Sequence, residues 1–170
     1  MADEAAAKKK YLIGWEQFHR DSRALARKLL DIRHDWKGIL AVTTGGLIPT
    51  GIISWELEVK LIDVIGISSY SGYDDPNQKE VKVIKNFDPA VVGDGDGWLV
   101  VDDLVDSGNT FRAVRAKLPK AHFAAVYAKP RGEPLADTFI GKVGDDHWIY
   151  FPWYQDIQPV DPIVYPHKKS

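Results

Sequence analysis

One stretch, residues 98–111, constrains this chain more than any other, because its order of residue types fits few local structures. Four apolar residues lead directly into the acidic pair Asp102 and Asp103, and a turn then leads into a run with helical spacing. A Val-rich run of this length is typical of a strand buried on both faces of a parallel sheet. We therefore expect the polar residues just past the carboxyl end of that strand, where open α/β sheets bind their ligands.

The turn at 106–110 has the composition of an anion site. Its small residues permit unusual backbone angles, and it opens a helix whose free N–H groups and dipole suit a phosphate. The carboxylates of Asp102 and Asp103 beside it suit ribose hydroxyls, a magnesium ion, or both. A plain strand–turn–helix connection with an acidic N-cap is the alternative interpretation. A receiver-type acidic pair would belong on the first strand, and here the pair lies past the middle of the chain.

Length, charge and composition exclude several classes of protein. The 170 residues fit one domain, and 22 basic against 24 acidic residues give no electrostatic reason to expect a nucleic-acid partner. The absence of cysteine excludes disulfides and thiolate metal sites and agrees with a cytoplasmic location. No stretch approaches the roughly 20 apolar residues of a membrane span, and no secretory signal precedes the first helix. We expect no integral membrane segment.

Strand-like and helix-like runs alternate along most of the chain. This order predicts an α/β fold, a mainly parallel sheet flanked by helices. We expect strands at 36–42, 59–67, 80–84, 98–101 and 121–128, helices at 15–32, 47–57 and 111–118, and an acidic turn at 87–97.

The predicted domain organisation has three parts. Residues 1–10 form a disordered tail, and residues 11–132 form the α/β core, including a flexible lid at 69–79 that is rich in turn formers. Residues 133–170 form a small irregular hood over the carboxyl edge of the sheet and end in a tail. Right-handed crossovers would bring the turns at 44–46 and 106–110 and the end of the 121–128 strand to that edge.

The stretch 98–111 resembles the 5-phosphoribosyl-1-pyrophosphate (PRPP) motif of type I phosphoribosyltransferases. That motif is four apolar residues, two acids, two apolar residues, then Asp, Ser or Thr, Gly, any residue and Thr. From about Tyr11 to Ile163 the chain is similar to the xanthine-guanine group of the bacterial enzymes. Segments that carry this similarity are 36–39, 67–70, 77–83, 119–123, 128–130, 148–149 and 152–153. The resemblance implies transfer of phosphoribose from PRPP, with Mg²⁺, to a 6-oxopurine such as guanine or xanthine, less readily hypoxanthine, releasing pyrophosphate.

The resemblance also implies roles toward PRPP. Asp102 and Asp103 face the ribose hydroxyls, and Asp103 contacts the magnesium ion; strand-end solvation is their alternative role. The lid contributes Ser69, Tyr70 and the basic Lys79, which otherwise reads as a solvated edge-strand lysine. Residues matched to the 5′-phosphate loop are Asp106, Ser107, Gly108, Asn109 and Thr110, and those matched to the pyrophosphate turn are Thr44 and Gly45.

Four residues match the purine site of the family. Asp106 matches the residue near N7, as a general base or as a stabiliser of charge on the ring, although it also suits a helix N-cap. Lys129 matches the donor to O6, which favours an oxo group over adenine's amino group. Trp148 matches the stacking partner of the base, and the Ile149 backbone matches the acceptor for a 2-amino group. Taken alone, Lys129 reads as a surface residue and the Trp-Ile pair as core.

Thr44 departs from the family pattern, which usually has Arg or Lys against pyrophosphate. Loss of that cation predicts weaker PRPP affinity, or compensation by Lys79 or a neighbouring subunit, with the backbone N–H groups of Thr44 and Gly45 still available to the anion. It also leaves open a PRPP- or nucleotide-sensing regulator that has lost catalysis. Asn109, often Gly in the family, is a milder departure. Family members of this size are commonly homo-oligomers, dimers or tetramers.

Overall fold

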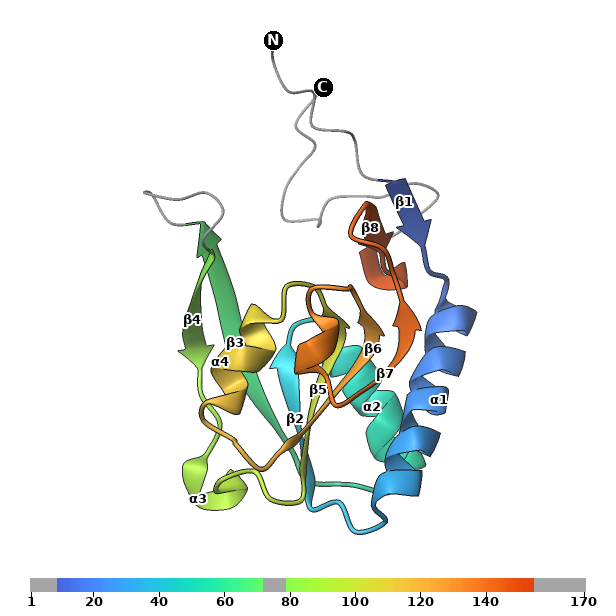
Figure 1. Cartoon of the computed structure of the whole chain (residues 1–170). Coiled ribbons are helices and arrows are strands. Elements are labelled where there is room, and N and C mark those ends of the chain that lie inside the picture. The colour runs from blue at the N-terminus through green and yellow to red at the C-terminus, as the bar shows by residue number, and fades with distance from the viewer. Residues whose placement is uncertain (1–8, 72–78, 155–170) are drawn as a thin grey trace.

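A computed structural model describes residues 9–71 and 79–154 of the chain (Figure 1). Its core is a six-stranded sheet in which each neighbouring pair is parallel, except that β4 runs antiparallel to β3 at one edge. The predicted α/β fold with a mainly parallel sheet is therefore confirmed. In spatial order the strands are β4 (Lys79–Lys85), β3 (Ile62–Ser71), β2 (Gly38–Thr43), β5 (Trp98–Val105), β6 (His122–Ala128) and β7 (Thr138–Lys142).

Helices cover both faces of this sheet (Figure 1). Helix α1 (Trp15–Ile32) and helix α2 (Leu47–Glu56) pack on one face, and α1 buries an apolar stripe that includes Phe18, Leu25 and Leu29. The short helices α3 (Pro89–Val92) and α4 (Asn109–Arg115) pack on the other face. The central strands are buried on both sides, as their near-continuous apolar runs predict.

A second, two-stranded sheet joins the two ends of the described chain. Strand β1 (Lys9–Leu12) pairs in parallel with β8 (His147–Tyr150), so Lys9 and Lys10, expected in a tail, are in a strand. The segment after 132 is more regular than expected, because β7 extends the main sheet beside β6. The 3₁₀ turn η1 (Glu133–Leu135) precedes β7, and the 3₁₀ turn η2 (Pro152–Tyr154) follows β8. The remainder of the expected tails lies outside the described residues.

Several expected boundaries differ from the structure. Strand β5 continues past the acidic pair to Val105, because its pairing with β6 is maintained at Leu104 and Val105. The acidic pair thus lies within β5, near its carboxyl end, and not beyond the strand. Strand β3 likewise begins and ends later than the expected 59–67, helix α4 is shorter than 111–118, and the expected 87–97 turn contains α3. No described helix has the length and apolarity needed to cross a membrane.

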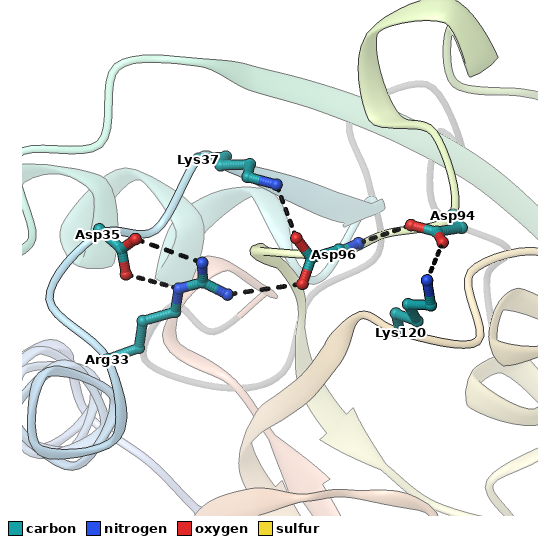
Figure 2. A network of polar contacts seen from close by, with 6 residues as sticks. All are labelled: Arg33, Asp35, Lys37, Asp94, Asp96 and Lys120. Atoms are coloured by element: carbon teal, nitrogen blue, oxygen red, sulfur yellow. Dashed lines mark hydrogen bonds and ion pairs between the residues drawn. The ribbon is translucent and has the colours of Figure 1, made fainter.

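A polar network closes the amino-terminal edge of the sheet (Figure 2). Asp96, just before β5, accepts a contact from Lys37 at 2.7 Å and lies 3.8 Å from the Arg33 guanidinium, which also forks onto Asp35 at 2.7 and 3.3 Å. Asp94 pairs with Lys120 at 2.7 Å and accepts the Asp96 N–H at 3.2 Å; the residues drawn are Arg33, Asp35, Lys37, Asp94, Asp96 and Lys120. These contacts tie together the loops that enter β2, β5 and β6.

Candidate active site

A small cavity of about 90 Å³ lies where β5 passes into α4. Gly108 has φ +79, and a Cβ there would lie 2.8 Å from the Leu135 side chain, so the turn requires glycine. The cavity is lined by the predicted PRPP residues Asp102, Asp106, Ser107, Gly108, Asn109 and Thr110, and also by Leu104, Val105 and Phe111. The turn therefore wraps a space of the size of a small anion.

The Gly-Gly turn before α2 packs directly on the acidic pair. A Cβ at Gly45 would lie 2.5 Å from the Asp103 carboxyl group, and one at Gly46 would lie 2.3 Å from the Val101 carbonyl oxygen. Glycine at both positions lets the backbone approach β5 this closely. The Thr43–Thr44 peptide bond is cis. The structure thus brings the predicted pyrophosphate turn, including Thr44 and Gly45, against the predicted ribose-binding carboxylates.

The two adjacent carboxylates point to opposite faces of β5, as alternation along a strand requires. Asp102 lines the cavity on the α4 side, while Asp103 faces the Gly45 turn, and the Asp103 N–H donates to Asp102 Oδ1 at 2.9 Å. Burial, and then the neighbouring carboxyl group of Asp103, raise the pKa of Asp102 well above its ordinary value. Burial raises the pKa of Asp103 to about 6. Among the described residues neither carboxylate has a Lys or Arg partner within ion-pair distance.

This donor set fits a magnesium ion that is shared with a substrate. Mg²⁺ prefers oxygen ligands and is usually bound by one or two carboxylates together with waters and substrate phosphates. Asp103, and beside it Asp102, offer such oxygens, and burial raises the pKa values of both, so a cation bound there would favour their charged forms. Within the described part of the chain no group of three or more potential ligand side chains is present, so substrate oxygens would complete the shell.

Lys129 and Asp106 form an ion pair at the same edge. The Lys129 ammonium lies 3.3 Å from Asp106 Oδ1, and the Lys129 side chain is only 2% exposed whereas that of Asp106 is 50% exposed. The Lys129 N–H donates to the Val105 carbonyl at 3.0 Å, and a Cβ at Gly132 would lie 2.5 Å from that same oxygen, which places the 129–132 turn against the end of β5. Lysine is rarely buried to this extent, and a buried ammonium requires a partner.

The hood is anchored to the core close to this pair. Trp148 and Ile149 lie on β8, opposite Lys10 and Tyr11 of β1; the Trp148 side chain is half exposed and that of Ile149 is buried. After β8, the ring of Phe151 lies 6.0 Å from that of Tyr127, two residues before Lys129 in the sequence. Figure 1 shows β8 on the side of the sheet where the parallel strands end. The predicted base-binding residues are therefore on the same side as the cavity.

The predicted lid residues are described only in their backbone. Ser69 and Tyr70 belong to β3 and Lys79 to β4, and the register pairs Tyr70 with Glu80. Their side chains, and residues 72–78 between them, lie outside the described residues. Their contacts with PRPP stay predictions.

Some contacts of the site could not be read from the sequence. Tyr127 donates its hydroxyl to Asp21 Oδ2 of α1 at 2.7 Å, and burial, followed by this carboxylate, raises the pKa of Tyr127. Arg112 donates at 2.8 Å to Oδ1 of Asn109, which lines the cavity. The spacing of Asn109 and Arg112, about one helical turn, is the one sequence signal for their contact. Nothing in the sequence joins Asp21 to Tyr127.

Fold and site together define an α/β protein in which separate loops converge at the carboxyl edge of a parallel sheet. The family model described as the phosphoribosyl transferase domain matches residues 14–158. The chain therefore belongs to the phosphoribosyltransferase family, and its fold is the type I fold of that family.

Named relatives agree with this family. The chain is 50% identical over 157 residues to the xanthine-guanine phosphoribosyltransferase of Desulfotalea psychrophila, which covers 92% of this chain and 94% of that protein. It is 48% identical over 159 residues to the protein of the same name from Ruegeria sp., covering 91% and 90%. Among solved structures it is similar to a purine phosphoribosyltransferase of Pyrococcus horikoshii, with a TM-score of 0.71, 26% identity and coverage of 90% and 98%.

Proposed function

We propose that this chain is a purine-salvage enzyme that transfers phosphoribose from PRPP to xanthine or guanine. The observation that carries this proposal is the Lys129–Asp106 pair, a buried cation held 3.3 Å from a carboxylate beside the 90 Å³ cavity. A 6-oxopurine offers an acceptor, O6, next to the N7 edge of its five-membered ring, so it matches a donor placed beside an acceptor. Identity near 50% to relatives named for xanthine and guanine supports the same substrates.

The reaction breaks one bond and forms one. The bond from C1 of the ribose to pyrophosphate breaks with its electron pair leaving on the phosphate oxygen, and a purine ring nitrogen forms the new bond to C1. The purine loses a proton, and Asp106 is placed to accept it or to stabilise the charge that develops on the ring. Lys129 donates to O6 and disfavours adenine, whose amino group would meet an ammonium. Trp148 stacks on the base, and the Ile149 carbonyl accepts from the 2-amino group of guanine.

The PRPP side of the reaction rests on the two turns at the end of β5. Residues 106–110 hold the 5′-phosphate, and Asp102 and Asp103 hold the ribose hydroxyls. Asp103 is the carboxylate that would hold Mg²⁺, which would neutralise charge on the departing pyrophosphate. The backbone N–H groups of Thr44 and Gly45 bind pyrophosphate oxygens in place of the missing cation, and Ser69, Tyr70 and Lys79 of the lid close over them.

The test is conversion of guanine, xanthine and hypoxanthine with PRPP and magnesium by wild type, Asp106→Ala and Asp106→Asn. Asp106→Asn keeps an oxygen for Lys129 but cannot take a proton, so it separates loss of the base from loss of the ion pair. We expect a fall of roughly a hundredfold or more in turnover for both variants, guanine and xanthine being better substrates than hypoxanthine. Asp31→Ala, an exposed carboxylate of α1, is the matched control and should turn over as wild type does.

One outcome would refute the proposal. Wild-type protein that binds PRPP but converts none of the three bases would favour the regulatory alternative. No observation in the described structure or among the relatives supports that alternative.

We further infer a cytoplasmic homo-oligomer, a dimer or tetramer, because small enzymes of this fold commonly associate. Sedimentation at micromolar concentration tests the association.

A further inference from the structure

Arg112 is hydrogen-bonded to a neutral residue that lines the 90 Å³ cavity. Its Nη1 donates to Asn109 Oδ1 at 2.8 Å, and Asn109 itself lines the cavity. The two residues are three apart on α4, so they share one face of the helix. The Arg112 side chain is exposed, while Asn109 and Thr110 are half-buried. The guanidinium is therefore at the surface, next to a residue that lines the cavity, and not in the core.

No lysine or arginine is among the described residues that line this cavity. Asp102 and Asp106 both line it, and a phosphate monoester would add up to two more negative charges. The charge of Lys129 is balanced by Asp106, which lies 3.3 Å away. Unlike-charged groups at contact distance attract by about 1 kcal/mol even in water, so a cation that reaches the bound anion changes affinity measurably.

Arg112 is suited to this role because its charge is not used elsewhere in the described structure. Arg33 and Arg115, by comparison, form ion pairs with Asp35 and Asp137. Within residues 9–71 and 79–154, the partner found for the Arg112 side chain is the Asn109 amide oxygen, which orients the guanidinium without neutralising it. A guanidinium has five N–H donors, so most of them stay available to phosphate oxygens.

We propose that Arg112, positioned by Asn109, is a binding residue for the 5′-phosphate of PRPP and of the nucleotide product. This inference rests on the proposed function for the identity of the phosphorylated ligand. It also gives Asn109 a role that the glycine often found at this position could not have, because the Asn109 amide oxygen positions the Arg112 guanidinium. Arg112 does not contact the reacting atoms, so its effect is on binding.

The experiment compares wild type with Arg112→Ala, Arg112→Lys, Asn109→Ala and the control Arg27→Ala, an exposed arginine of α1. Calorimetric titration measures the binding of ribose 5-phosphate and, separately, of inorganic pyrophosphate. We expect Arg112→Ala to weaken ribose 5-phosphate binding by about tenfold, the loss of one charge-assisted contact, and Asn109→Ala by a smaller factor. Arg112→Lys should recover part of the loss, because it restores the charge without the planar fork.

Pyrophosphate distinguishes a specific contact from a change in net charge. We expect its affinity to stay within twofold of wild type in Arg112→Ala, since it binds the Thr44–Gly45 turn on the other face of β5. Steady-state kinetics should then show a raised KM for PRPP, with the KM for guanine and kcat nearly unchanged. Equal loss of affinity for both anions, or ribose 5-phosphate affinity within twofold of wild type or absent from wild type, would overturn the role of Arg112.

Turnover separates this inference from the proposed function. Wild-type conversion of guanine with no effect of Arg112→Ala on ribose 5-phosphate binding would reject the inference and leave the proposed function intact. Wild type that converts no purine but binds ribose 5-phosphate through Arg112 would reject the proposed function and leave the phosphate contact intact. Thermal unfolding of each variant shows whether the fold is retained, and Arg112→Lys replaces Arg112→Ala if it is not.

Discussion

Carboxylates at the two ends of the parallel strands, the amino-terminal and the carboxyl edge of the central sheet, have opposite electrostatic surroundings. At the amino-terminal edge, Asp96 and Asp94 each meet a cation at 2.7 Å, and a hydrogen bond from Lys37 or Lys120 lowers the pKa of each (Figure 2). At the carboxyl edge, burial raises the pKa values of Asp102 and Asp103, and no described Lys or Arg pairs with them. The first edge completes its charges internally, whereas the second leaves them for a ligand.

This difference separates carboxylates that hold loops together from carboxylates held ready for chemistry. An exposed ion pair adds little stability, but several in a network fix the approach of strands. A buried acidic pair without a cation costs stability and is maintained where a ligand supplies the counter-charge. Both edges are rich in Asp, so residue type alone does not distinguish them. Four predictions test the contrast, in order of decreasing effect.

The largest effect is expected for activity. Asp103→Asn keeps the shape of the side chain but removes the charge that we assign to magnesium and ribose. Turnover with PRPP should fall on the order of a hundredfold, because an electrostatic contact made at the reacting end of PRPP is lost. Asp96→Asn at the other edge is the matched control and should stay within twofold of wild type. Similar loss in both variants would break the comparison.

The same Asp103→Asn variant should be more stable than wild type near pH 7 in metal-free buffer. Because the folded-state pKa of Asp103 is raised from 3.8 to about 6, the folded state binds more protons than the unfolded state in that window. Stability is therefore lost as pH rises from about 4 to 6, and Asn avoids this loss, by about 1–3 kcal/mol at pH 7. Urea unfolding at pH 4 and pH 7 measures the difference. A variant less stable than wild type at pH 7 contradicts the assigned cost of burying the Asp103 charge.

Asp96→Asn should destabilise the protein, in the opposite direction but by less. It removes the Lys37 contact at 2.7 Å and the longer Arg33 contact at 3.8 Å. Because these groups are exposed, we expect a fall in Tm of about 1–3 °C that disappears in 1 M salt. Differential scanning calorimetry at low and high salt makes the measurement. A salt-independent fall would show that Asp96 acts through packing.

The smallest effect is expected at His122, the first residue of β6, on the amino-terminal edge. Burial, chiefly, lowers its pKa, and its Nε2 lies 2.8 Å from Thr138 Oγ1 of β7. A lowered folded-state pKa means that stability is present above pH 6.5 and is lost as pH falls through the folded-state value. His122→Asn should flatten the pH dependence of unfolding between pH 7 and 5, relative to a His34→Asn control on an exposed loop. An unchanged slope would assign that dependence to other groups.

Much of the fold followed from local patterns. The helix predicted at 15–32 has those bounds, because its apolar stripe and charged face have a clear period of 3.6. The β5 strand and the Gly-rich turns followed from a Val-rich run and from residues that tolerate positive φ. The sequence could not predict that β5 pairs onward to Val105 or that β7 joins the sheet. Those boundaries depend on neighbouring strands, which supply the hydrogen bonds that extend a ladder.

The candidate site divides in the same way. Asp102, Asp103 and residues 106–110 are contiguous, so a single motif predicts them together, and the structure places nearly all of them around one cavity. The contacts between them and distant segments are another matter. The burial of Lys129 against Asp106 and the approach of Gly45 to Asp103 required the packed sheet. A lysine after a strand reads as exposed until its surroundings are known.

By itself the sequence determined the alternation of elements, the loops that carry polar residues and the family motif, because these depend on residue order over short distances. Tertiary structure alone decided which carboxylates meet cations and which do not. Asp96 precedes β5 and Asp103 lies near its carboxyl end, and no local sequence pattern shows which of the two meets a cation. The difference arises because Lys37 and Arg33 contact Asp96 at the start of β5, whereas the backbone at Gly45 packs against Asp103 near its end. Those partners are distant in sequence.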